Sequence, residues 1–439
     1  MSENSPVRTY QILCALGVGL GGFMIGNALG WSSSAEPILL KTYDDGELRW
    51  IYSFLHVGAI VADIYICFTI DFLGRRSAIY LITLPFFFGW TILGTAESFA
   101  KFCLGRFILG FGTAVACIYA PSYITEVADK KIRGALNEIF IFAIALGMIV
   151  VYCMEVLDSM ILITLPFCSV PVIFLVILLL LPGSPIMLCK KKQKENAKQT
   201  LQLFRGQNYN IDGEFEEMEK YTTSYFLEFK DALKENGCVR GTIMVISMHC
   251  AQQLTGSYAI IFFARRICDI ANVLANPNHG AIIFASVQLV GSLICALLVD
   301  RLGRKPLWIV SLVLMGLSHT LTGLYFAEKE ESKINPIATL AILMAAYSLG
   351  AGPHPFMMSS ELLPMEVKSF SNSLAMGCSW FIGLLLTHLF SHAINTEGMR
   401  YYVFFMFGIL CFVSALLIMG VLIETKRKTL EQIRNELDS

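Results

Sequence analysis

Long apolar runs alternate with short polar stretches along almost the whole chain. A membrane-spanning helix needs about 20 mostly apolar residues, and twelve runs reach or approach that length, six on each side of a longer polar segment. The predicted spans are residues 10–31, 49–70, 78–97, 99–127, 136–157, 160–182, 240–264, 279–299, 306–326, 336–360, 370–393 and 399–423. The pattern therefore predicts an all-α membrane protein with twelve transmembrane helices.

The same pattern divides the chain into four parts. Residues 1–182 are predicted to form a first six-helix bundle, and residues 240–423 a second one. Residues 183–239 are polar and rich in Lys and Glu, so we expect a cytoplasmic linker with short amphipathic helices rather than a domain with its own core. Residues 424–439 are predicted to be a cytoplasmic tail.

Composition excludes several classes of protein. Hydrophobic residues make up 55% of the 439 residues and charged residues only 15%, whereas soluble domains are about 25% charged. The formal net charge of −1 gives no sign of a nucleic-acid partner. The 13 cysteines lie mostly in apolar runs without metal-ligand spacing, so we expect no metal and no cofactor. No catalytic set converges on one spacing, and an enzyme is not expected.

Basic residues concentrate in alternate loops, which fixes the predicted orientation. With both termini in the cytoplasm, every inner loop carries Lys or Arg and the outer loops hold few, as the positive-inside rule requires. The inner basic residues are Arg75, Arg76, Lys130, Lys131, Arg133, Lys190, Lys191, Lys192, Arg301, Arg304, Lys305, Lys368, Lys426, Arg427 and Lys428. We expect a monomer in the plasma membrane.

Two short patterns occur twice. The run from Asp71 to Arg76 returns from Asp300 to Lys305, 229 residues later. Glu126 precedes Arg133 by seven residues, and Glu361 precedes Lys368 by seven, at a shift of 235 residues. Two similar shifts at matching loops indicate two related halves. The alternative is that these loops carry charge only to set topology, which explains the Arg and Lys but not the acids.

The repeated charges are predicted to form an inter-helix network that biases the opening of the two halves. One pair needs to supply only about 1–3 kcal/mol to shift such an equilibrium. The predicted network is Asp71, Arg75, Arg76, Glu126, Arg133, Asp300, Arg304, Lys305, Glu361 and Lys368.

Polar and helix-breaking residues stand out within two spans of the second half. Gln252 and Gln253 are amides, which donate and accept hydrogen bonds and therefore suit a hydroxyl-rich solute. The alternative is that they join helices to each other. Glycine and proline interrupt the span 336–360 and predict a hinge, or alternatively a static kink. These residues are Gly350, Gly352, Pro353 and Pro355.

Six motifs together resemble the sugar porter family of the major facilitator superfamily, over nearly the whole length. They are Arg106-Phe107 with Gly110 and Gly112; Pro121 to Glu126 with Arg133-Gly134; Leu181 to Pro185; Gln252 to Gly256; Gly350 to Pro355 with Glu361-Leu362; and Glu424 to Lys426. Gly30-Trp31-Ser32-Ser33 looks most like the insect facilitated trehalose transporters of that family. The resemblance implies the major facilitator fold and uniport of a sugar such as a hexose or trehalose.

The chain departs from the family where the resemblance implies the sugar binds. An Asn of the family is replaced by Tyr258, a Gln by Ile141, and a Trp by Phe356. Ser379 replaces an Asn before Trp380, whereas the amide at Gln288 is retained. The predicted solute-binding residues are therefore Gln252, Gln253, Tyr258, Gln288, Phe356, Ser379 and Trp380.

These departures leave the solute open. A polyol or an organic ion is an alternative to a sugar, and so is a sugar sensor that does not transport. The predicted first span contains no Asp or Glu, and Asn27 lies at the level where proton-coupled members are expected to carry an acid near Arg106. An intramembrane carboxylate is the usual proton carrier. Its absence favours facilitated diffusion. Arg265 and Arg266 are expected to snorkel at the outer end of a helix.

Overall fold

The computed structural model describes residues 8–69, 75–129, 131–223, 235–328, 332–363, 365–426, 428 and 430–438. These residues are helical with short connections. The first half contains α1 (Thr9–Leu39), α2 (Asp45–Thr69), α3 (Arg75–Gly94), α4 (Phe99–Val127), α5 (Arg133–Met154), α6 (Met160–Thr164) and α7 (Ser169–Leu180). The second half contains α12 (Asn236–Leu254), α13 (Ser257–Phe262), α14 (Ala264–Ala271), α15 (Asn278–Leu302), α16 (Arg304–Glu328), α17 (Pro336–Leu349), α18 (His354–Leu362), α19 (Met365–Asn395) and α20 (Arg400–Val421).

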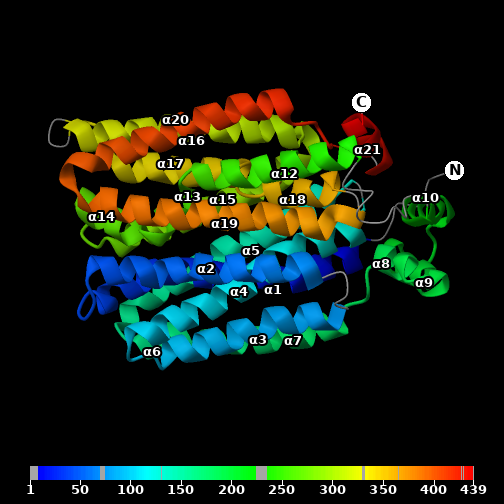
Figure 1. The fold of residues 1–439 in the computed structure, drawn as a ribbon, viewed down its shortest axis with the longest axis horizontal. Coiled ribbons are helices and arrows are strands. Elements are labelled where there is room, and N and C mark those ends of the chain that lie inside the picture. Colours follow the sequence, from blue (N-terminus) through cyan, green and yellow to red (C-terminus); the bar gives the residue numbers. More distant parts are fainter. Residues whose placement is uncertain are drawn as a thin grey trace.

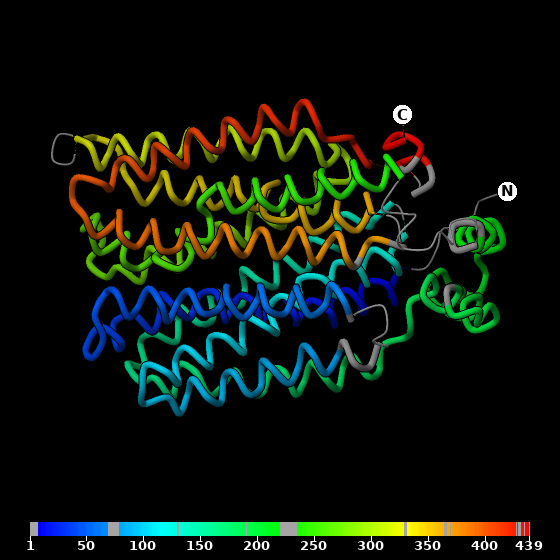
Figure 2. The backbone as a smooth tube through the Cα atoms, in the orientation of Figure 1, coloured from blue at the N-terminus to red at the C-terminus, as the bar shows by residue number. Residues whose placement is uncertain are grey.

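The two halves lie side by side along the long axis of the molecule (Figure 2). Helix α1 begins and α20 ends at the same end of the bundle (Figure 1). The short helices α8 (Pro185–Lys190), α9 (Lys194–Arg205) and α10 (Asp212–Thr223) also lie there, together with α21 (Leu430–Asp438). We call this the linker end. The contact surface between the two halves is called the seam.

Ten helical segments among the described residues are long and apolar enough to cross a membrane. The two other predicted spans do not meet this requirement of length and apolar character, each for a different reason. The described apolar part of α3, Ile79–Gly94, is short. The span predicted at 240–264 is divided between α12 and α13. With these two segments included, the layout has twelve spans.

The break between α12 and α13 corrects the prediction of one continuous helix. Gly256 has φ +73°, in the left-handed region that disfavours residues with a Cβ. A Cβ at Gly256 would lie 2.6 Å from the Phe407 ring. The interruption of the span 336–360 was predicted, and α17 ends at Leu349, before Gly350, while α18 begins at His354. Each of these two spans is thus made of two shorter helices.

Gly256→Ala is expected to lower the melting temperature of the purified protein. The left-handed backbone costs an L-residue about 1–2 kcal/mol, and the new methyl group would also displace the Phe407 ring. Gly420→Ala is the matched control, because a Cβ at that position in α20 meets nothing within 4 Å. An unchanged melting temperature for Gly256→Ala would contradict the break at this residue.

Two other predicted boundaries differ from the structure. The first span was predicted to end at residue 31, but α1 continues to Leu39 and includes the buried Glu36. The first helix therefore does carry an acid, two turns beyond Ala28 and near the end opposite the linker. The predicted span 160–182 contains α6, a short 3₁₀ turn and α7.

Candidate solute site and gates at the seam

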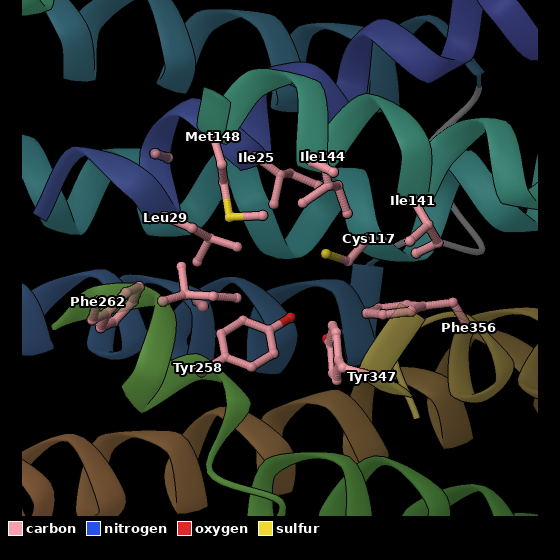
Figure 3. Close-up of a cluster of buried hydrophobic side chains, with 14 of the residues drawn as sticks. Ile25, Leu29, Cys117, Ile141, Ile144, Met148, Tyr258, Phe262, Tyr347 and Phe356 are labelled. Carbon is pink, nitrogen blue, oxygen red and sulfur yellow. The ribbon is translucent and has the colours of Figure 1, made fainter. Parts of the chain in front are cut away.

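The centre of the seam is packed with apolar side chains from both halves. Figure 3 shows them meeting across the seam in a group that we call the central cluster. Its labelled members are Ile25 and Leu29 of α1, Cys117 of α4, Ile141, Ile144 and Met148 of α5, Tyr258 and Phe262 of α13, Tyr347 of α17 and Phe356 of α18. Among these labelled members, the first half supplies aliphatic groups, a thioether and a thiol, and the second supplies aromatic rings.

Polar atoms in the central cluster come from the second half. The hydroxyls of Tyr258 and Tyr347 are hydrogen-bonded to each other. Gln252 donates through Nε2 to the Gly352 carbonyl at 2.8 Å and lies 3.4 Å from the Tyr347 hydroxyl. Gln252 therefore joins α12 to the break between α17 and α18. This is the helix-joining role that the sequence analysis gave as the alternative to solute binding, and one side chain can have both roles.

The remaining predicted solute-binding residues are also buried along the seam. Phe356 packs edge-on against Phe140 of α5, with ring centroids 6.3 Å apart. Trp380 packs edge-on against Tyr258 at 5.8 Å. Ser379 is 1% exposed. Gln253 and Gln288 are 2% and 1% exposed, and their Oε1 atoms have no hydrogen-bond partner among the described residues.

A small cavity lies at the seam beside Gln288, lined by Tyr152 and Met148 of the first half and Ile261 of the second. Its volume of about 10 Å³ is at the lower limit for one water molecule. This cavity is therefore too small to hold a sugar. That the seven residues bind solute stays a prediction.

Ion pairs and hydrogen bonds connect the halves at the linker end. Glu361 of α18 lies 3.3 Å from Arg304 Nη2 and 3.9 Å from Arg133 Nη1 of the first half. Asp300 pairs with Arg304 at 3.2 Å and accepts a hydrogen bond from the Ala135 amide of α5 at 3.0 Å. These residues form the linker-end network, to which we assign Arg133, Asp300, Arg304 and Glu361.

Two hydroxyl contacts extend this network. Thr125 of α4 and Ser360 of α18 are hydrogen-bonded at 2.7 Å across the seam. Thr425 donates to Glu361 Oε2 at 2.6 Å. Because Glu361 is only 3% exposed, these partners replace the water that its carboxylate would otherwise contact. The seam is therefore closed at the linker end.

The other predicted network residues have different surroundings. The Lys305 amide donates to Glu424, which also accepts from the Arg304 amide and so caps the start of α16. Lys368 is half-buried in the first turn of α19, where the carboxylates of Glu126 and Glu361 act on it electrostatically. Asp71 lies outside the described residues, and so do the side chains of Arg75 and Arg76, which begin α3. A role of this network in opening stays a prediction.

The opposite end of the seam is closed by a second set of contacts that the sequence did not predict. Arg265 of α14 pairs with Glu155, which follows α5, and its amide donates to Ser33 of α1 at 3.1 Å. Arg266 lies 3.5 Å from Asp45 and donates to Asn395 at 3.0 Å. A pocket of about 420 Å³ lies beside the Arg265–Glu155 pair. The two arginines therefore cross the seam instead of only snorkelling, which corrects our expectation.

Arg106 of α4 is a fully buried charged group, at 0% exposure. It donates to the Ala28 carbonyl and to the Ser32 hydroxyl, both on α1. Its guanidinium also lies 5.3 Å from the Trp31 ring and 5.8 Å from the Phe262 ring. Among the described residues no acid pairs with Arg106, so the charge is stabilised by neutral acceptors and ring faces.

Comparison with known proteins identifies the family. A family model described as "Sugar (and other) transporter" matches residues 10–437. The facilitated trehalose transporter Tret1 of Apis mellifera ligustica is 27% identical over 98% of this chain and 89% of its own length. Tret1 of Bombyx mori is 29% identical over 98% of this chain and 87% of its own length.

Solved structures show the same fold. The proton:xylose symporter XylE bound to 6-bromo-6-deoxy-D-glucose matches with a TM-score of 0.84 and 20% identity, over 98% of this chain and 99% of that one. The inward-open XylE from E. coli matches with a TM-score of 0.73. The arrangement of twelve spans in two halves that meet at a seam is thus the fold of the major facilitator superfamily. The chain is a transporter rather than an enzyme, and it belongs to the family of sugar (and other) transporters.

Proposed function

We propose that this protein carries a sugar such as trehalose or a hexose across the plasma membrane by facilitated diffusion, as a monomer with both termini in the cytoplasm. The observation that carries the proposal is the distribution of polar groups along the seam. Polar contacts join the two halves at both ends of the seam, and uncharged hydrogen-bonding groups lie between those ends. In alternating access, a solute held between two halves is released when one end opens and the other stays shut. The family match and the trehalose transporters among the relatives support the choice of a sugar.

The solute would lie against Gln252, Gln253, Tyr258, Gln288, Phe356, Ser379 and Trp380. Amide and hydroxyl groups suit the hydroxyls of a sugar, and the Trp380 ring suits an apolar sugar face. A neutral solute is favoured over an organic ion, because the buried charge of Arg106 is already engaged by α1. The aliphatic side of the central cluster favours a solute with fewer hydroxyl groups, such as a small polyol, as the second candidate.

The expected result in proteoliposomes is saturable uptake of trehalose or glucose that stops at equal concentrations on both sides. A pH gradient across the membrane should not drive accumulation, because no acid pairs with Arg106 in the described part of the chain. Accumulation above equilibrium under an inward proton gradient would contradict facilitated diffusion. Absence of uptake for every sugar and polyol tested, with oriented protein confirmed in the vesicles, would reject the proposal.

Two substitutions test the site assignment in the same assay. Gln252→Ala should lower uptake severalfold, because it removes an amide that we propose binds the solute, together with its contact to the Gly352 carbonyl. Tyr258→Asn should raise the affinity for glucose severalfold, since each added hydrogen bond contributes about 1 kcal/mol. If neither substitution alters uptake, the seven residues do not form the site.

A further inference from the structure

Two carboxyl groups of the first half are buried at the seam. Asp63 of α2 is 1% exposed, and neither of its carboxyl oxygens has a hydrogen-bond partner among the described residues. Glu138 of α5 is also 1% exposed, and its Oε2 atom has no partner in the same part of the chain. Acids inside the membrane are rare and mark functional sites by default. Neither the proposed solute site nor the linker-end network uses these two.

Asp63 is surrounded by small and neutral groups. A Cβ at Gly377 of α19, in the second half, would lie 3.7 Å from the Cβ of Asp63. The titratable groups that interact with Asp63 are two thiols, Cys67 on the same helix and Cys117 of α4, which belongs to the central cluster (Figure 3). No Lys, Arg or His in the described chain acts on it electrostatically. A negative charge on Asp63 would thus have neither water nor a cation to stabilise it.

Glu138 touches the second half directly. Its Oε1 atom lies 3.3 Å from the Cys295 thiol of α15. Asp300 of α15 and Arg304 of α16 act on Glu138 electrostatically, whereas α1 and α4, which also pack against α5, contribute no such group among the described residues. Arg304 already pairs with Asp300 and Glu361, so it does not neutralise a third carboxylate.

Both acids lie in the part of the seam that must separate when the linker end opens. Glu138 is one turn beyond Ala135, whose amide donates to Asp300 in the linker-end network. Asp63 is less than two turns before Thr69, where α2 ends. Separating α5 from α15, and α2 from α19, would therefore bring water to both carboxyl groups.

The protonation of the two acids follows from these surroundings. Burying a carboxylate ion without a partner is so unfavourable that the group binds a proton instead. In water, Asp and Glu lose their protons above about pH 4. The closed seam therefore holds protons that an open linker end would release.

We propose that Asp63 and Glu138 each bind a proton when the seam closes at the linker end, and release it to the same side when that end opens. This goes beyond the proposed function, because it places the conformational equilibrium under the control of pH. Since each proton enters and leaves at the same end, it does not cross the membrane. Transport is then pH-sensitive without being proton-coupled.

Higher pH should favour the open conformation. The closed conformation binds more protons, so its advantage is complete below about pH 4 and falls by up to tenfold per proton for each pH unit above that. Buried histidines such as His56 act in the opposite direction, because an imidazole gains a proton in water below about pH 6.5. Thiols add to the effect only near and above about pH 8.5. The two acids therefore dominate between pH 7 and pH 8.

The test measures the distance between the two halves at the linker end. Spin-labelled noncanonical residues would replace Lys131 and Arg301, which are exposed on opposite halves. Pulsed electron spin resonance of the full chain in lipid nanodiscs then gives the closed fraction at pH 7 and pH 8. For the wild type we expect the ratio of closed to open protein to fall by about tenfold to a hundredfold. Ser360→Ala, which removes the contact with Thr125, supplies an open population if the wild type is fully closed at both pH values.

Substitutions assign the effect to the two acids. Asp63→Asn and Glu138→Gln should each remove part of the pH dependence and raise the closed fraction at pH 8, and the double variant should lose the dependence. Asp63→Leu and Glu138→Met, which are also neutral, replace the amides if those do not fold. Glu216→Gln is the matched control, because Glu216 is exposed on α10 at the linker end. It should behave like the wild type.

A double variant that keeps the pH dependence of the wild type would overturn the inference. So would a closed fraction that does not change with pH in either the wild type or Ser360→Ala. An inward proton gradient that drives accumulation in the wild type but not in the double variant would show that the protons cross the membrane, which contradicts release to the same side. The distance measurement needs no solute, so failure of uptake would reject the proposed function alone.

Discussion

Glu361→Ala is expected to cost about 3–5 kcal/mol of stability, because it removes one partner from a buried network of charges. Arg304 is 2% exposed and would keep only Asp300 as a carboxylate partner in the linker-end network. Arg133 would lose its contact across the seam. The melting temperature of the purified protein in detergent should fall by several degrees.

The same substitution should favour opening at the linker end. Glu361 joins α18 to Arg133 of the first half, so its loss weakens the closed conformation more than an open one. Hydrogen exchange at the first turn of α5, where the Ala135 amide donates to Asp300, should accelerate. Uptake should slow, because the linker end must close again in every cycle.

Glu219→Ala is the control for Glu361→Ala. Glu219 pairs with Lys194 on the surface of the linker helices, where the hydrogen bond raises the pKa of Lys194. Exposed pairs contribute little to stability, so the melting temperature and exchange at α5 should match the wild type. If Glu361→Ala behaves like Glu219→Ala, the linker-end network does not hold the halves together.

Arg106→Ala is expected to destabilise the protein by about 3–5 kcal/mol, the range seen when a large buried side chain is cut back to alanine. The substitution leaves a cavity between α4 and α1 and removes both hydrogen bonds to α1. The contacts with the Trp31 and Phe262 rings are lost with them. Thermal unfolding in detergent would measure the change.

Two other substitutions separate the parts of this effect. Arg106→Met keeps most of the volume and removes a buried charge that has no acidic partner, so it should destabilise much less than alanine. Arg106→Lys keeps the charge but lacks the planar fork that reaches both Ala28 and Ser32, so it should not restore wild-type stability. Equal losses for Ala and Met would mean that the charge itself stabilises the fold.

The sequence by itself determined the membrane class and the number of spans, because a long apolar run must be buried in lipid whatever its neighbours are. It also located the interruption at Gly350 to Pro355, since glycine and proline act on the local backbone. The break at Gly256 was missed. The residue is a lone glycine between Thr255 and Ser257, with no proline beside it to mark a break.

The tertiary structure decided which polar residues meet. Arg133 and Glu361 are 228 residues apart in the chain, yet they face each other at 3.9 Å across the seam. Arg265 was expected to meet water and lipid headgroups and instead meets Glu155 and Ser33. Glu138 lies within the predicted span 136–157, and its contact with Cys295 arises only when α5 docks against α15.

Burial in lipid is a property of each segment, whereas pairing across the seam depends on the relative rotation and position of helices from different halves. Hydropathy along one helix carries no information about those rotations, because the seam and the lipid both receive apolar side chains. The sequence could therefore show which segments of the chain span the membrane. Only the packed bundle could show which polar groups face each other across the seam.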